Sequence, residues 1–134
     1  MSKPRSIPNP LQILIVEDVD AMRELLDLTL REIPGIKVSG AVSNTFEARV
    51  ELTRRRPHLV LLDEILPGES SLDFLAEVKA LEIPVLLITS IVGRTHALAD
   101  GAVGRMVKPT WNTLDEDRVR IQKTLFDLAT TLFA

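Results

Sequence analysis

The 134-residue sequence contains no cysteine and no tyrosine, and only 4% of its residues are aromatic. Without cysteine the chain has neither disulfide bonds nor thiolate metal ligands. It also has no apolar run of membrane-spanning length, and its opening residues, MSKPRSIPNPLQ, lack the apolar centre of a secretory signal. These absences predict a cytoplasmic protein that does not enter a membrane.

Positive charge is not in excess either. The 16 lysine and arginine residues against 19 aspartate and glutamate residues give a formal net charge of −3 at pH 7. A dedicated nucleic-acid-binding protein has an overall basic balance, so direct binding to nucleic acid is not expected. The one basic cluster, Arg54 to Arg56, is interpreted as the solvated end of a helix.

A chain of this length with 46% hydrophobic residues is large enough for one globular domain with a continuous core. Three prolines fall among the first ten residues, which predicts a flexible tail over residues 1–10. The domain itself is expected over residues 11–134.

Short continuous apolar runs alternate along the chain with segments whose apolar residues recur at helical spacing, a pattern typical of repeated β–α units. We count five units, with strands expected at residues 11–16, 36–41, 59–62, 85–88 and 102–107. Strands that are apolar on both faces and separated by single helices predict an α/β fold. Its centre is expected to be a doubly wound, five-stranded parallel sheet with helices on both sides.

The intervening helices are expected to bury the residues, mostly apolar, that recur every three or four positions. These are Ala21, Leu25, Leu28 and Ile33; Phe46, Val50 and Leu52; Leu72, Leu75, Val78 and Leu81; and Leu114, Arg118, Ile121, Leu125, Leu128 and Leu132. Residues 92–99 leave room for only a short fourth helix. Asn44 or Ser43 is a candidate helix cap, and Thr113-x-x-Glu116 has the form of a capping box.

Five polar residues mark the points where apolar, β-branched runs break off: Glu17, Asp18, Asp63, Thr89 and Lys108. In a parallel α/β sheet these points meet at the carboxyl edge, where open α/β sheets bind ligands. Carboxylate oxygens suit a hard cation such as Mg²⁺, while an ammonium group and a hydroxyl bind phosphate oxygens. The set therefore predicts a site for Mg²⁺ and a phosphoryl group.

Asp63, at the end of a strand, can serve as a metal ligand, a general base or a nucleophile. Two neighbouring acids and a lysine favour a nucleophile beneath a metal, because a carboxylate can attack phosphorus to form an aspartyl phosphate. Phosphoryl transfer needs mainly positioning and charge stabilisation, so a constellation this small suffices. For a single carboxylate the alternative is a helix cap, a role open to Asp18 and Asp20 ahead of the first helix.

Together these motifs resemble the receiver domain of two-component response regulators, the CheY-like family, over residues 11–132. In order, Glu17 and Asp18 match the acidic pair, Asp63 the phosphoacceptor, Thr89 the switch hydroxyl and Lys108 the lysine before Pro109, with Pro67-Gly68 after the phosphoacceptor. The resemblance implies a flavodoxin-like three-layer (βα)5 sandwich and Mg²⁺ as cofactor. It also implies the backbone carbonyl of Ile65 as a further metal ligand.

By this resemblance the chain is expected to be a single-domain receiver that takes a phosphoryl group on Asp63 from a histidine kinase or a histidine phosphotransfer protein. It would signal through an unknown downstream protein target or by onward phosphotransfer, and a phosphorylation-dependent homodimer is left open. Its own phosphorylation and dephosphorylation would be its only catalysis. Two alternatives are a protein-binding module that works without phosphorylation and an aspartate-nucleophile hydrolase, for which this length offers no cap domain.

The sequence departs from the receiver pattern at three places. Arg105 stands three positions before Lys108, where most receivers carry an aromatic residue, and its charge would need a partner in an apolar slot. Glu64 directly follows Asp63, where it either adds negative charge near the metal or faces water. The nineteen positions from Thr89 to Lys108 are about one helical turn fewer than in the usual receiver. Signalling by the usual aromatic switch is therefore not expected.

His58 and His96 lie apart from the acidic cluster in the predicted topology, so they are expected to be surface or packing residues. The last helix carries a second apolar row, which either forms a partner surface or packs back onto the domain. That row consists of Val119, Phe126, Ala129 and Phe133. Trp111 could belong to either surface.

Overall fold

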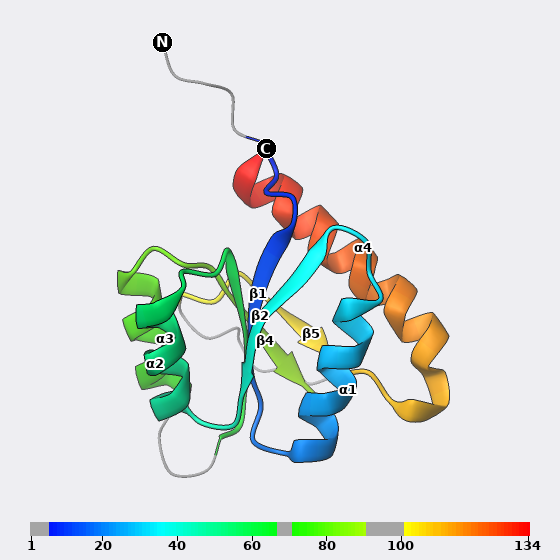
Figure 1. Ribbon diagram of the computed structural model, residues 1–134, viewed down its shortest axis with the longest axis horizontal. Helices are drawn as coiled ribbons and strands as arrows, with labels where there is room; N and C mark the ends of the chain where they lie inside the picture. Colours follow the sequence, from blue (N-terminus) through cyan, green and yellow to red (C-terminus); the bar gives the residue numbers. More distant parts are fainter. Residues whose placement is uncertain (1–5, 67–70, 91–100) are drawn as a thin grey trace.

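A computed structural model describes residues 6–66, 71–90 and 101–134 of the chain. Its centre is a five-stranded parallel sheet with the strand order β2-β1-β3-β4-β5 (Figure 1). The strands are β1 (Leu11–Val16), β2 (Ile36–Val42), β3 (Leu59–Asp63), β4 (Val85–Thr89) and β5 (Gly104–Val107). The predicted parallel α/β sheet is confirmed, although β5 begins at Gly104 rather than at residue 102.

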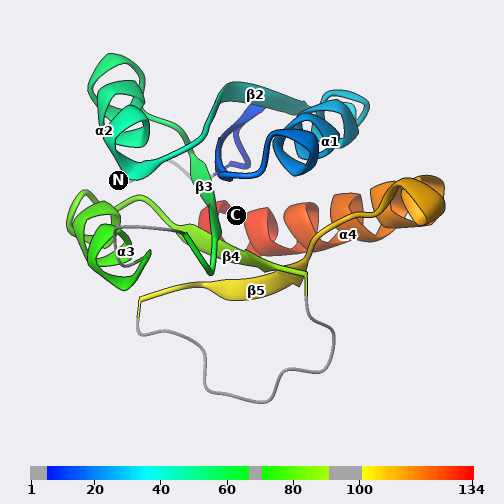
Figure 2. The same ribbon diagram turned by 90° about the horizontal axis from the view of Figure 1, so that it is seen from below.

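Helices cover both faces of this sheet. The described ones are α1 (Asp20–Arg31), α2 (Thr45–Arg54), α3 (Ser71–Ala80) and α4 (Leu114–Phe133), and a 3₁₀ turn, η1 (Trp111–Thr113), precedes α4. α1 and α4 lie on one face of the sheet, and α2 and α3 lie on the other (Figure 2). The helix expected at residues 92–99, the Pro67-Gly68 turn and His96 lie outside the described residues. No helix in the described ranges has the length and apolar character needed to cross a lipid bilayer.

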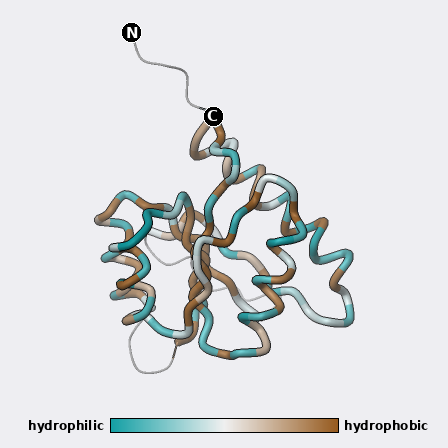
Figure 3. The backbone as a smooth tube through the Cα atoms, viewed as in Figure 1, coloured by the Kyte–Doolittle hydropathy of each residue, from teal (hydrophilic) through white to brown (hydrophobic). Residues whose placement is uncertain are grey.

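Strand side chains alternate between the two faces of the sheet, and both faces are buried. One cluster joins Ile13, Ile15, Leu61 and Ile88 to Leu26 and Leu30 of α1 and to Ile121 and Leu125 of α4. The other joins Leu14, Val16, Leu62 and Leu87 to Ala48 of α2 and to Phe74 and Val78 of α3. Figure 3 shows hydrophobic residues concentrated along the central strands. Ile7, ahead of β1, is partly buried against the first cluster.

The first two helices bury only part of the rows that their spacing predicts, with Leu25 of α1 buried as expected. In α2, Phe46 and Val50 are 72% and 43% exposed, and the helix packs through the fully buried Ala48 instead. A small residue at the contact lets the helix approach the sheet closely, which leaves the larger apolar side chains on its outer side. In α1, Leu26 is buried whereas Leu28 is 42% exposed.

The later helices follow the prediction more closely, with the middle of each row buried. Leu75 and Val78 in α3 and Leu125 in α4 are inaccessible to solvent, or nearly so. Leu72 and Leu81, near the two ends of α3, are 60% and 47% exposed. The row of α3 therefore faces the core only over its central turns.

The helix starts agree with the sequence only in part. Asn44 caps α2, because its side chain accepts a hydrogen bond from the Glu47 N–H at 2.8 Å. The capping box predicted at Thr113 is wrong. The Thr113 hydroxyl donates instead to Asp117 Oδ2 at 2.7 Å, and the same oxygen accepts the Thr110 N–H at 2.8 Å.

His58 is a packing residue, as predicted. Its Nδ1 accepts the Gln12 N–H at 2.9 Å, and its ring meets that of Phe133 edge-on with centroids 6.2 Å apart. Phe133 and Phe126 pack against the core cluster, so this part of the second apolar row of α4 folds back onto the domain. Val119, by contrast, is 65% exposed.

Candidate functional site

Backbone hydrogen bonds between parallel strands carry the predicted site residues to one edge of the sheet. Asp63 is the last residue of β3, and Thr89 is the last residue of β4. Just beyond the strands, the Glu17 N–H donates to Val42 O at 3.0 Å and the Lys108 N–H donates to Thr89 O at 2.7 Å. The site therefore lies at the carboxyl ends of the strands, next to β1 and β3, where the strand order reverses.

Three carboxylates meet at this edge. Glu17, Asp18 and Asp63 each offer one oxygen, and these oxygens lie within 4.8 Å of one another. Glu17 is fully buried and Asp63 is 5% exposed, so water screens their charges weakly. Asp18 is half-buried, and because α1 begins without a side-chain cap, neither Asp18 nor Asp20 caps that helix.

Lys108 joins two of these carboxylates from the end of β5. Its Nζ lies 2.5 Å from Glu17 Oε1 and 3.2 Å from Asp63 Oδ2. Burial disfavours the ammonium charge, but the two carboxylates outweigh burial and raise the pKa of Lys108 above its usual value. Lys108 is therefore a fixed positive charge beside the predicted phosphoacceptor.

The carboxyl group of Asp63 is strongly perturbed. Its pKa is raised from 3.8 to about 7, with burial as the largest cause and the neighbouring Glu17 as a further one. The Ile65 N–H, which donates to Asp63 Oδ1 at 3.0 Å, and the charge of Lys108 oppose this rise. Asp63 is therefore only partly ionised at neutral pH in the metal-free protein.

The residues present fit a hard divalent cation. Glu17 Oε1 is buried and receives no well-directed hydrogen bond within the described ranges, although the Lys108 ammonium lies 2.5 Å away. One ammonium group does not balance the three carboxylates whose oxygens lie within 4.8 Å of one another, and such a set of oxygen donors matches the preference of Mg²⁺. The Ile65 carbonyl stays a predicted additional ligand.

Sequence reasoning missed the partner of Arg105. The Arg105 Nε donates to Glu64 Oε1 at 2.5 Å, and their side chains are only 18% and 14% exposed. Neither sequence-based reading of Glu64 describes this arrangement, since Glu64 forms a half-buried ion pair across the sheet. The signal was available, because the two departures from the receiver pattern carry opposite charges.

Comparison with protein families matches residues 13–118 to the response regulator receiver domain. The chain belongs to this family. Its five-stranded sheet has the strand order of CheY-like receivers. Receiver domains catalyse only their own phosphorylation, which confirms the prediction that this region is not an enzyme acting on a separate substrate.

Solved receiver structures resemble this chain closely. CheY6 from R. sphaeroides, in complex with the P1 domain of CheA3, is 26% identical with a TM-score of 0.76, covering 90% of this chain and 99% of CheY6. The response regulator TrrA from Thermotoga maritima, in complex with Mg(2+)-BeF, is 30% identical with a TM-score of 0.65, covering 84% of this chain and 96% of TrrA. TrrA, a receiver similar to this chain, thus binds Mg²⁺ together with beryllium fluoride.

A curated relative, protein-glutamate methylesterase/protein-glutamine glutaminase 5 of Anaeromyxobacter dehalogenans, is 33% identical over 127 residues. The match covers 88% of this chain but 35% of the relative. The chain spans about a third of the length of the curated relatives that it matches. This share is too small to assign their enzyme activity to this chain.

Proposed function

We propose that this receiver domain accepts a phosphoryl group on Asp63 from a histidine kinase or a histidine phosphotransfer protein, with Mg²⁺ as cofactor. It then signals by contact with a downstream protein or by passing the group on. The observation that carries this proposal is the position of Asp63, whose carboxylate lies 3.2 Å from the ammonium of Lys108 and beside two further carboxylates.

The transfer follows from what each residue can do. An oxygen of Asp63 attacks the phosphorus of a phosphohistidine, so that an O–P bond forms while the N–P bond breaks and its electron pair returns to the imidazole nitrogen. Lys108 neutralises phosphoryl oxygens, and the Thr89 hydroxyl donates a hydrogen bond to one of them. Glu17, Asp18, Asp63 and the Ile65 carbonyl would hold Mg²⁺, which supplies the remaining positive charge. That charge also favours the ionised, nucleophilic form of Asp63.

The choice of donor rests on the solved relatives. CheY6 was crystallised with the P1 domain of CheA3, and TrrA was crystallised with the histidine kinase ThkA. A cytoplasmic location and a homodimer formed on phosphorylation belong to the same proposal.

Intact-mass measurement after incubation with Mg²⁺ and acetyl phosphate tests the function. The wild type is expected to gain one phosphoryl group, while Asp63→Asn and an EDTA-treated sample gain none. Asp27→Asn is the matched control, because it removes a carboxylate that pairs with Arg31 on α1 at 2.7 Å. Labelling of Asp63→Asn to the wild-type extent would show that the phosphoacceptor is elsewhere.

The Glu64–Arg105 ion pair favours one second candidate, a protein-binding module that works without phosphorylation, because it occupies the place of the usual aromatic switch. Beryllium fluoride with Mg²⁺ separates the two candidates. A receiver that takes phosphate is expected to change its Trp111 fluorescence and its backbone NMR shifts. No mass gain together with no spectral change would favour the binding module.

A further inference from the structure

The Glu64–Arg105 ion pair spans one strand of the sheet. Glu64 follows Asp63 at the end of β3, and its N–H donates to Ile88 O of β4 at 3.0 Å. Arg105 belongs to β5, where it lies opposite Leu87 of β4. The two side chains therefore meet across β4 and join two strands that are not hydrogen-bonded to each other.

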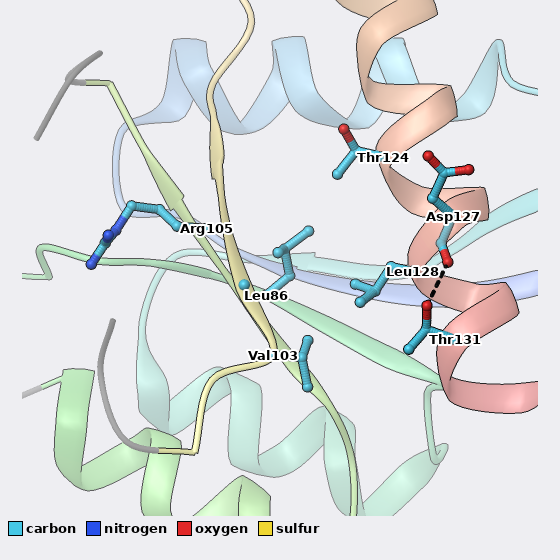
Figure 4. Close-up of a pocket in the computed structure, with 8 residues that line it drawn as sticks. Leu86, Val103, Arg105, Thr124, Asp127, Leu128 and Thr131 are labelled. Atoms are coloured by element: carbon cyan, nitrogen blue, oxygen red, sulfur yellow. Dashed lines mark hydrogen bonds between the residues drawn. The ribbon is translucent and has the colours of Figure 1, made fainter. Parts of the chain in front are cut away.

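This pair lies on the face of the sheet away from α4. Thr124, Asp127 and Leu128 belong to α4, and Figure 4 shows the side chain of Arg105 extending away from them. The next residue along β5, Met106, is buried in the cluster that contains α4, as strand alternation requires. Arg105 thus holds Glu64 on the side of the sheet opposite to α4.

The position of Glu64 makes such a restraint useful. Its Cα is about 3.8 Å from that of Asp63, and its long side chain has several rotatable bonds. An unrestrained carboxylate there would be a fourth acid beside Glu17, Asp18 and Asp63. It would compete with an incoming phosphoryl group for the charge of Lys108 and for a bound cation.

We propose that Arg105 is a positioning residue that holds the Glu64 carboxylate out of the acidic site, so that Lys108 and the cation stay available to the phosphoryl group. This inference rests on the proposed phosphorylation of Asp63. A guanidinium suits the role, because it stays charged at every physiological pH and holds a carboxylate in a defined direction. Removing the guanidinium alone weakens the hold on a negative charge next to the site, whereas removing both charges leaves no such charge.

The rate of phosphorylation by acetyl phosphate in Arg105→Gln, Glu64→Gln and the double variant tests this proposal. Arg105→Gln is expected to react about tenfold more slowly than the wild type, the effect of one unscreened charge near the site. Glu64→Gln should react at least as fast as the wild type, and the double variant should recover to within about threefold of it. Both single variants should lower the melting temperature, since each removes a largely buried ion pair and keeps one of its two charges.

Two further variants refine the measurement. Arg105→Lys keeps the charge and should restore most of the rate. Arg49→Gln is the control for loss of an ion pair, because Arg49 pairs with Glu77 between α2 and α3 at 2.6 Å. It should lower stability without slowing phosphorylation.

Mg²⁺ titration followed by Trp111 fluorescence gives a readout that needs no phosphorylation. A released Glu64 adds a carboxylate to the cation site, so Arg105→Gln should lower the half-saturating Mg²⁺ concentration several-fold, and the double variant should reverse this change. Trp111 is suited to report it, being the only tryptophan and lying three residues after Lys108.

The outcomes separate the two proposals. If both single variants slow phosphorylation alike and the double variant does not recover, the pair is only a structural brace and the inference is wrong. A wild type that takes no phosphoryl group would instead refute the proposed function, and unchanged Mg²⁺ affinity in Arg105→Gln would then refute the role of the pair as well.

Discussion

Replacing Asp63 by asparagine is expected to stabilise the metal-free protein above neutral pH. The pKa of Asp63 is about 7 in the folded protein against 3.8 for the ordinary group. Well below pH 3.8 the carboxyl group is protonated in both the folded and the unfolded state and has no effect on stability. As the pH rises from about 3.8 to about 7, the unfolded state releases the proton while the folded state keeps it. The wild type therefore loses stability until the pH passes about 7.

The size of the effect follows from the shift. A difference of about three pKa units corresponds to a ceiling of about 4 kcal/mol in the free energy of unfolding at pH 8. The asparagine still accepts the Ile65 N–H, but its amide can place donors against the ammonium of Lys108. We therefore expect a gain of about 1 to 3 kcal/mol, or a rise of about 4 to 10 °C in Tm.

Urea and thermal unfolding in EDTA, at pH 8 and again at about pH 3, measure this gain. The difference between Asp63→Asn and the wild type should be full at pH 8 and should vanish in acid. Asp27→Asn removes a partly exposed carboxylate and should change stability by less than about 0.5 kcal/mol at either pH. If Asp63→Asn is no more stable than the wild type at pH 8, Asp63 is not electrostatically strained and the reasoning fails.

Mg²⁺ should reduce the difference in the free energy of unfolding between Asp63→Asn and the wild type. At ten times its dissociation constant, a ligand that binds only the folded state adds about 1.4 kcal/mol. The wild type is expected to gain this amount, while Asp63→Asn, with one carboxylate fewer in the site, gains less. An equal gain in both proteins would place the cation away from Asp63.

Three further predictions concern stability away from the acidic cluster. Burial lowers the pKa of His58, so its contribution to stability is present above pH 6.5 and is lost as the pH falls below it; His58→Gln should flatten this part of the pH profile in urea unfolding. Just beyond the end of α3, Glu82 has a positive φ of 62°, and the Ile83 N–H donates to Val78 O. A helix that ends in this way favours glycine at the residue with positive φ. Glu82→Gly should therefore raise the free energy of unfolding by about 1 kcal/mol, and a loss would contradict this. Leu125→Ala should lower that free energy by about 2 to 5 kcal/mol, because the side chain is fully buried.

The order and type of the elements could be read from the sequence, because they depend on local periodicity. The run over residues 11–16 is a strand at those bounds, and the polar residues after such runs reach one edge because parallel strands end together. This is why Glu17, Asp63 and Lys108 could be grouped across more than ninety positions of sequence. The acidic cluster could thus be predicted from the sequence alone.

Contacts between elements could not be read in the same way. The choice between Phe46 and Ala48 as the buried residue of α2 depends on how closely that helix approaches the sheet, and the Asp117 cap depends on the turn before α4. The sequence by itself determined the parallel α/β fold and the members of the acidic cluster, since both follow from patterns within single elements. Only the tertiary structure decided that Glu64 and Arg105, 41 positions apart, neutralise each other, because their pairing depends on the order in which three strands lie side by side.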